Sequence, residues 1–320
     1  MRPNILITAA GRRVSLVQGF QAAAHPEQRQ VLAADARRER SAACHIADGA
    51  HSLPLASSPD FGKALLDLCQ RQDVGLVVPT IDPELSILAA LRNPFLAEGV
   101  EIVVSDPTFI ADCADKRRTK QLFERLGIDT PEVHSWPDVP GFPLFAKPYD
   151  GSGSVGARVL TSHIDAQSAI DECDRLMLCD YMDPRDHDEF TVDCYYDRDS
   201  RLKCAVPRQR IEVRNGEVAQ ARTARNELVD ELFEHVGTLA GARGMVTIQA
   251  FVDRELRTTS YIEINARVGG GYPLSRIAGA DYQRLLVDEY LNDVPPPIVD
   301  DWRDNAIMLR YDAEVVRFEP

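Results

Sequence analysis

The sequence predicts a mixed α/β and α+β protein: a Rossmann-like lobe in the first third, followed by a body in which strands succeed one another. Three observations predict this fold class. Up to about residue 106, apolar β-branched runs alternate with helical patterns, as in a parallel sheet covered on both faces. From about residue 143, strand-like runs follow one another with two helices between them. A glycine-rich segment, residues 151–156, stands near the start of this second part.

Four apolar runs predict the strands of the first lobe, and a helical stretch from Val14 to Ala24 follows the first of them. The runs are Asn4 to Ala9, Gln30 to Ala34, Val74 to Pro79 and Val100 to Val104. The turn from Thr8 to Arg13 lacks the glycine fingerprint of a dinucleotide site, although Asp35 ends the second strand where a ribose ligand would stand. A dehydrogenase is therefore a distant alternative, which NADH binding would be needed to revive.

The loop from Pro79 to Glu84 follows a buried strand and has two interpretations. The carboxyl ends of such strands are a natural ligand crevice, so the loop could line a substrate pocket. Alternatively it starts a helix, with Asp82 as the cap and Pro83 at the first helical position. The pattern favours the helix start.

A helical pattern from Asp115 to Leu126 ends at Gly127 and leads through a proline-rich segment into the second part. Two further helices are predicted at about 164–174 and 227–242, and Ala306 to Arg310 is predicted as a closing strand. The other predicted strands are 143–148, 156–160, 176–181, 190–197, 202–207, 209–214, 246–252 and 259–264.

Composition excludes several classes of protein. The 320 residues suffice for two or three packed lobes, and 36 basic against 50 acidic residues give a formal charge of -14, which disfavours a nucleic-acid partner. No apolar run reaches the roughly 18 residues of a membrane span, and no leader pattern precedes the first strand, so a cytoplasmic protein is expected. The seven cysteines form no C-x-x-C pair, and the seven histidines are scattered, which argues against disulfides and zinc.

The strongest chemical signal is the segment from Phe145 to Gly156, in which Lys147 precedes a glycine-rich loop. Because the loop lies between two strands, it is a hairpin and not the strand-to-helix turn of a dinucleotide site or a P-loop. Such a hairpin can fold its amides over a polyphosphate, to which Lys147 would bring a cation. A protein kinase is excluded because the chain has neither a His-Arg-Asp nor an Asp-Phe-Gly motif.

A second signal lies at the end of the chain's predicted strands. Glu263, Asn265 and Arg267 alternate along one strand and share a face, and Gln249 lies in the strand before it. A carboxylate, amide oxygens and a nearby cation suit Mg²⁺ that bridges protein and phosphates. A solvated strand face with a Glu–Arg ion pair is the plainer alternative. The phosphate loop upstream favours the metal site.

Between the two signals, Leu178 to Asp183 predicts an apolar strand that runs into a linker with exposed backbone, able to hydrogen-bond an adenine edge. Glu189 could take ribose hydroxyls. The acidic stretch 183–189 has a solvated turn as its alternative.

With these pieces in this order, the chain resembles the ATP-grasp superfamily, in particular its carbamoyl-phosphate-synthase-like and amino-acid-ligase branches. The resemblance covers nearly the whole chain. It implies a Rossmann-like pre-ATP-grasp domain over 1–106, then linker helices and a small ATP-grasp lobe over 107–178. A C-terminal ATP-grasp catalytic lobe over 179–320 completes the two-lobed ATP-grasp fold.

The resemblance also implies roles for individual residues. Lys116, after Asp115, matches the first nucleotide-binding basic position, and Lys147 matches the second, while Arg267 would steady the transferring phosphoryl group. The mobile phosphate lid would comprise Gly151, Ser152, Gly153, Ser154 and Gly156. The adenine hinge would comprise Asp180, Tyr181 and Met182, with Glu189 as the ribose carboxylate. The metal ligands would be Gln249, Glu263 and Asn265, with Gln249 where many relatives carry a carboxylate.

The implied cofactors are ATP and one or two Mg²⁺ ions, which Mn²⁺ could replace. The implied activity is an ADP-forming carboxylate–amine ligase that activates a small acid as an acyl phosphate and passes it to an amine. An amino-acid carboxylate is the preferred acyl donor, by resemblance to the ligase that joins lysine to methylornithine in pyrrolysine synthesis. A homodimer is compatible with this interpretation.

Two features bear on the substrate. Arg208 and Arg210 alternate on one strand face, where two guanidiniums together could bind a substrate carboxylate or phosphate. A basic strand on the outside of an acidic protein is the alternative. The turn from Val268 to Tyr272 carries three glycines and could present amides to an acyl phosphate.

Two other functions stay open on the sequence. One is a carbamoyl-phosphate-synthase-like enzyme, a carboxylase or kinase, that acts on bicarbonate or another small acid; complete carbamoyl phosphate synthesis is not expected from a single half. The other is a nucleotide-binding regulatory protein without turnover, against which the presence of Lys147, Glu263, Asn265 and Arg267 argues.

Overall fold

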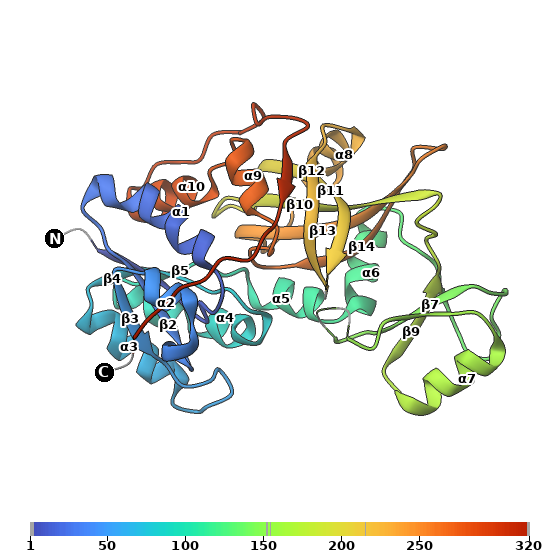
Figure 1. Ribbon diagram of the computed structural model, residues 1–320, viewed down its shortest axis with the longest axis horizontal. Coiled ribbons are helices and arrows are strands. Elements are labelled where there is room, and N and C mark those ends of the chain that lie inside the picture. The colour runs from blue at the N-terminus through green and yellow to red at the C-terminus, as the bar shows by residue number, and fades with distance from the viewer. Residues whose placement is uncertain (1–2, 152, 154, 215, 319–320) are drawn as a thin grey trace.

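The computed structural model describes residues 3–151, 153, 155–214 and 216–318. The parallel-sheet lobe and the small lobe lie at opposite ends of the long axis, with the large antiparallel sheet between them (Figure 1). Within the described residues, no helix combines the length and apolar content needed to cross a bilayer.

The first lobe is a five-stranded parallel sheet in the order β3-β2-β1-β4-β5. Its strands are β1 (Asn4–Ile7), β2 (Val31–Asp35), β3 (Gly49–Ser52), β4 (Val74–Val78) and β5 (Glu101–Ile102). Its helices are α1 (Val14–Ala24), α2 (Ala42–Ile46), α3 (Phe61–Arg71) and α4 (Asp82–Ala97), with 3-10 turns at His25–Glu27 and Arg38–Arg40. The parallel sheet is confirmed; β3 escaped prediction because its four residues are small or polar and only partly buried at the sheet edge.

Helices cover both faces of this sheet because neighbouring residues of the central strand point in opposite directions. Leu6 packs into the cluster that contains Leu65 of α3 and Leu88 of α4. Ile5 belongs instead to the cluster that contains Val17 of α1. On that second face lies also α10 (Tyr282–Leu291), a helix near the end of the chain (Figure 1).

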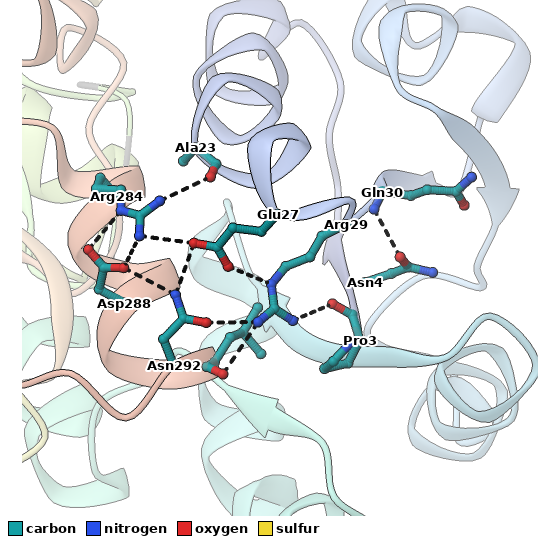
Figure 2. A network of polar contacts seen from close by, with 10 residues as sticks. Pro3, Asn4, Ala23, Glu27, Arg29, Gln30, Arg284, Asp288 and Asn292 are labelled. Atoms are coloured by element: carbon teal, nitrogen blue, oxygen red, sulfur yellow. Dashed lines mark hydrogen bonds and ion pairs between the residues drawn. The ribbon is translucent and has the colours of Figure 1, made fainter. Parts of the chain in front are cut away.

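A polar cluster ties α10 to the first lobe (Figure 2). The buried Arg29 guanidinium donates to Glu27 Oε2 at 3.2 Å, to the Pro3 carbonyl at 3.0 Å and to Asn292 Oδ1 at 2.8 Å. Arg284 of α10 reaches Glu27 Oε1 at 2.9 Å. These contacts hold the first lobe against the C-terminal lobe. They thereby also fix the loops that meet where the two lobes pack together.

The small lobe is an antiparallel sheet in the order β6-β9-β7-β8, covered by one helix. Its elements are β6 (Val133–His134), β7 (Leu144–Pro148), β8 (Arg158–Leu160), α7 (His163–Glu172) and β9 (Leu176–Asp180). Ala166 and Ala169 of α7 pack with Leu144, Leu160 and Leu178 in a separate core. Two helices, α5 (Pro107–Ala114) and α6 (Lys116–Arg125), connect this lobe to the first.

The large lobe is a six-stranded antiparallel sheet in the order β14-β13-β10-β11-β12-β15. Its strands are β10 (His187–Tyr196), β11 (Leu202–Arg214), β12 (Glu217–Thr223), β13 (Gly244–Asp253), β14 (Thr259–Asn265) and β15 (Ile307–Leu309). Its remaining helices are α8 (Glu227–His235) and α9 (Pro273–Ala278). The closing strand at the end of the chain is confirmed.

Two predictions for this lobe were wrong. The runs 202–207 and 209–214 form the single strand β11, because Pro207 sits beyond the end of β12 at Thr223 and its missing N–H costs no ladder bond. The helix predicted over 227–242 ends at His235. The chain then turns through Gly241, whose φ of +85° suits glycine.

Candidate active site

A cavity of about 660 Å³ lies between the small sheet and the large sheet. Most of the residues singled out from the sequence line it, although they come from segments more than a hundred positions apart. The lining includes Lys116, Lys147, Gly151, Gly153, Asp180, Tyr181, Met182, Glu189, Arg210, Gln249 and Glu263. Apolar side chains such as Phe145, Val159 and Phe251 complete the walls. A cavity of this size and mixed lining suits a ligand as large as a nucleotide.

Two lysines bring positive charge to this cavity. Lys147 extends from β7, and burial lowers the pKa of its ammonium, which Lys116 nearby lowers further. No hydrogen bond or ion pair of the Lys147 ammonium is found within the described part of the chain. Lys116 begins α6 and its ammonium donates to the Gly151 carbonyl at 2.5 Å. Two cations at one end of a cavity favour an anionic ligand there.

The glycine-rich turn borders the same end of the cavity. Gly151, Gly153 and Val155 line it, and Gly153 has a φ of +64°, in the region that favours glycine. Gly156 also has a positive φ, of +77°, but packs against Pro148 and is not among the lining residues. Ser152 and Ser154, predicted as part of the phosphate lid, lie outside the described residues.

The predicted metal ligands lie on two neighbouring strands. Gln249 of β13 and Glu263 of β14 face each other across the ladder, and both line the cavity. Asn265, two residues further on β14, donates its amide to Glu263 Oε1 at 3.0 Å. One carboxylate and two amide oxygens on adjacent strands are a donor set that fits Mg²⁺ shared with phosphate oxygens. The residues present therefore fit the metal that the sequence implied.

Ile262 departs from the predicted alternation. The sequence placed Ile262 with Ile264 on the buried face, yet Ile262 is only partly buried and lines the cavity beside Glu263. The ladder between β13 and β14 shifts register between Gln249 and Ala250, so β14 carries one extra residue at this point. Such a bulge turns a side chain from one face toward the other.

Arg267 lies where the large lobe meets the first lobe. Its guanidinium donates to Asn265 Oδ1 at 3.3 Å and to Asp82 Oδ2 at 2.8 Å. Asp82 belongs to the loop with two interpretations, of which the helix start is confirmed: α4 begins there, although Ile81 is the cap and Asp82 is the first helical residue. The Asp82 carboxylate pairs with Arg267, and a role of the loop in a substrate pocket stays a prediction.

The predicted adenine hinge follows the end of β9. Tyr181 and Met182 lie outside any strand and line the cavity. The Asp180 carboxylate turns to β6 instead, where it pairs with His134 Nε2 at 2.6 Å and accepts from the Glu132 N–H at 3.2 Å. The Asp180 side chain therefore fixes the start of this linker, and Tyr181 and Met182 line the cavity after it.

The structure does not bring the guanidiniums of Arg208 and Arg210 together on one ligand. Arg208 is buried and holds both oxygens of Asp193, at 2.7 Å and 3.0 Å, under Gly271. Arg210 lines the nucleotide-sized cavity and pairs with Glu189 Oε1 at 2.7 Å. Burial raises the pKa of Glu189, which the neighbouring Arg210 opposes. Each arginine thus has its own carboxylate, and the predicted substrate fork is absent among these described residues.

The sequence does not single out one residue that the structure brings to this junction. Arg13 lies in the turn that lacks the dinucleotide fingerprint, and its guanidinium reaches the large lobe and donates to the Val268 carbonyl at 3.4 Å. Two successive arginines in the turn after the first strand, at the carboxyl edge of a parallel sheet, are the signal that could have identified it.

Two family models match the chain. Residues 5–103 match the family model of PylC-like N-terminal domains, and residues 172–309 match the model described as ATP-grasp in the biosynthetic pathway with Ter operon. No curated protein sequence matches the chain.

Several solved structures share the fold. The biotin carboxylase domain of Hydrogenobacter thermophilus 2-oxoglutarate carboxylase is 17% identical, with a TM-score of 0.72 over 96% of this chain and 74% of that one. N5-carboxyaminoimidazole synthetase from Staphylococcus aureus is 16% identical, with a TM-score of 0.69 over 96% and 80%. An L-amino acid ligase from Bacillus licheniformis is 16% identical, with a TM-score of 0.68 over 91% and 75%.

Fold, site geometry and family models point the same way. The predicted fold class, with a Rossmann-like lobe followed by a two-lobed body, is confirmed by these likenesses over more than nine-tenths of the chain. The chain belongs to the ATP-grasp superfamily.

Proposed function

We propose that this protein is an ADP-forming ligase that uses MgATP to activate a small carboxylic acid as an acyl phosphate and couples it to an amine. The single observation that carries the proposal is the cavity with Lys147 and Glu263 at one end, from which β14 leads through Asn265 to Arg267. This arrangement supplies cations where phosphates would lie and a guanidinium at the exit toward the first lobe.

The chain's own residues suggest how the nucleotide is held. Lys116 and Lys147 would bind phosphate oxygens, Tyr181 and Met182 would offer backbone to adenine, and Ile262 would pack against its ring. Glu189 would accept from ribose hydroxyls through the oxygen that Arg210 does not occupy. ADP and MgADP are bound by the S. aureus synthetase and the H. thermophilus domain, which supports ATP and Mg²⁺ as the cofactors.

Gln249, Glu263 and Asn265 would hold Mg²⁺, which supplies neutralisation of phosphate charge when bound. A carboxylate oxygen of the acid attacks the γ-phosphorus, ADP leaves, and Arg267 stabilises the charge on the moving phosphoryl group. The amine then attacks the acyl carbon, and phosphate leaves with formation of the amide. The glycine-rich turn would keep water from the acyl phosphate until the amine arrives.

An amino acid is the acid that we propose. The support is the likeness to an L-amino acid ligase and to PylC-like N-terminal domains, together with an arginine pair at the junction of the lobes. A homodimer is part of the same proposal, in line with the dimer of the H. thermophilus domain.

The test is release of ADP from MgATP in the presence of amino-acid pools, with hydroxylamine as a trap. Acid-dependent ADP release with a hydroxamate product is expected, and division of the pool then identifies the acid. Glu263→Gln should lower turnover by about 10²–10³-fold, since it removes the one carboxylate among the proposed metal ligands. Glu255→Gln is the matched control, because Glu255 is exposed in the turn of the same hairpin.

Two results would contradict the proposal. One is the absence of MgATP binding by the intact protein. The other is acid-dependent ADP release that yields no hydroxamate and no amide, which would exclude an acyl phosphate that an amine can capture.

A further inference from the structure

Two guanidiniums from different lobes converge on one carbonyl oxygen. Arg13, in the turn after β1, donates to the Val268 oxygen at 3.4 Å, and Arg267 donates to the same oxygen at 3.3 Å. Like charges repel at such a separation, and the repulsion is strong where water is partly excluded. The two arginines therefore mark a place where an anion would be stabilised.

Arg13 is held in this position by a rigid turn. Its guanidinium also donates to the Thr80 carbonyl at 2.8 Å, and Thr80 in turn donates its hydroxyl to Ala9 in the same turn as Arg13. The Gly11 N–H donates to the Asp35 carboxylate at 2.9 Å. Asp35 thus accepts a hydrogen bond from the backbone of the turn and holds the turn that carries Arg13. The guanidinium is therefore already in position before a ligand binds.

The carboxylates that act on Arg13, Asp82 and Glu217, pair with other arginines. Asp82 pairs with Arg267, and Glu217 accepts from both Arg12 and Arg310, at 2.7 Å and 2.9 Å. Arg13 has no carboxylate ion pair among the described residues. The acceptors of the Arg13 guanidinium are two backbone carbonyls, of Val268 and Thr80, in a protein whose formal charge is -14.

The electrostatics of Arg13 agree with this lack of an ion pair. Burial, and then the charge of Arg267, lower the pKa of Arg13 to about 10. The guanidinium still carries its full charge at neutral pH. The charges of Glu217 and Asp82 offset part of the cost of burying it, and an anion bound beside it would offset more.

We propose that Arg13 and Arg267 together bind the anionic group that takes part in phosphoryl transfer: the carboxylate of the acid, and then the phosphoryl group that it has received. Planar guanidiniums suit this role because each can donate two parallel hydrogen bonds to carboxylate or phosphate oxygens. This inference rests on the proposed function and adds a binding residue from the first lobe. It also makes the acid site a junction that exists only when the two lobes are packed together.

The position of the pair relative to the nucleotide cavity supports this role. Glu263 lines the cavity, Asn265 bonds to Glu263, and Arg267 bonds to Asn265, so the three side chains form a continuous row along β14. Arg13 lies at the far end of that row, outside the cavity lining. A phosphoryl group that leaves the metal end would therefore pass to the arginine pair.

The experiment uses inorganic phosphate as the probe, with the full-length protein saturated with MgADP. Phosphate binding is followed by isothermal titration calorimetry for the wild type, Arg13→Gln, Arg13→Lys and Arg12→Gln. Arg13→Gln is expected to weaken phosphate binding at least about tenfold, because it removes a charge-assisted donor. The phosphate affinity of Arg13→Lys should lie between those of the wild type and Arg13→Gln, since lysine keeps the charge and loses the planar pair of donors. Arg12→Gln is the matched control, since Arg12 is the next residue along and its side chain is 85% exposed.

The outcomes separate this inference from the proposed function. MgADP affinity should stay within about twofold in Arg13→Gln, since Arg13 does not line the nucleotide cavity. An unchanged phosphate affinity in Arg13→Gln, or a wild type that binds MgADP but no phosphate in the millimolar range, would overturn the inference alone. Failure of the wild type to bind MgADP would overturn the proposed function. Arg13→Lys, which keeps the charge, guards against a loss of binding caused by misfolding of the Gln variant.

Discussion

Two turns that contain glycine follow strands in this protein, and they have opposite properties. In the turn after β1, the Gly11 N–H is taken by Asp35 and the Ala10 N–H by the Ala34 carbonyl. In the turn after β7, Gly151 and Gly153 line a cavity of about 660 Å³ beside Lys147. The first turn is a structural brace, and the second faces a space with charge and room for a ligand.

The difference teaches that glycine spacing alone does not make a phosphate loop. A backbone N–H binds phosphate only where the protein has not already provided its acceptor. Asp35, which the sequence suggested as a ribose ligand, is that acceptor in the first turn. The turn after β7 is followed by the strand β8, and the cation of Lys147 precedes the turn. Three predictions can break or sharpen this comparison.

The largest effect is expected at the cation of the second turn. Lys147→Gln should lower ATP-dependent turnover by about 10³-fold, because it removes a half-buried charge that has no ion pair among the described residues. Steady-state ADP release and calorimetric MgADP binding measure it. Lys63→Gln, on the exposed face of α3, is the control and should behave as wild type. Full activity in Lys147→Gln would remove the second turn from the active site.

The next effect concerns the brace of the first turn. Glu84 is 4% exposed, accepts from the Thr8 hydroxyl at 2.5 Å, and burial raises its pKa from 4.5 to about 7. A folded-state pKa above the unfolded one means that the protein loses stability as pH rises from 4.5 to 7, where only the unfolded chain ionises. The side chain of Glu84→Gln cannot ionise. The free energy of unfolding of this variant, relative to that of the wild type, should therefore increase by about 3 kcal/mol from the lower to the upper end of that pH range.

Urea unfolding of both proteins at pH 5 and pH 8 measures this gain. The effects of all other groups cancel in the difference between variant and wild type. Parallel stability curves for the two proteins would show that Glu84 titrates normally and that the brace does not depend on its proton.

The smallest effect compares the glycines themselves. Gly11 and Gly153 both have positive φ, +48° and +64°, so alanine at either should cost about 1 kcal/mol of backbone strain. In the braced turn, Gly11→Ala should appear as lower thermal stability with MgADP affinity unchanged. In the open turn, Gly153→Ala should lower stability by no more than this and should in addition weaken MgADP binding. The same pattern for both variants would mean that the two turns do not differ in function.

The sequence could predict the elements whose signals are local. The alternation of apolar runs and helical patterns indicated the parallel lobe, and residues 14–24 form α1 as predicted. Lys147 before the glycines, and Glu263 with Asn265 on one strand face, needed only spacing to be identified. Strand β3 could not be found in this way because its residues are small or polar. It is a strand because it pairs with β2.

Partnerships across lobes were beyond the sequence. Arg208 and Arg210 share a strand face as predicted, yet each is bound by a carboxylate of β10, which only the register of that strand decides. Ile262 reaches the cavity through a bulge that one strand cannot reveal without its partner.

By itself, therefore, the sequence determined the class of fold and the residue types at the proposed nucleotide site, since both rest on residue types at short spacings. Only the tertiary structure decided which charges meet. Arg13 and Arg267 are 254 positions apart in the chain and converge on one carbonyl oxygen because the first lobe packs against the large one. Electrostatic interactions depend on distance in space, and that distance is fixed by the packing of whole lobes.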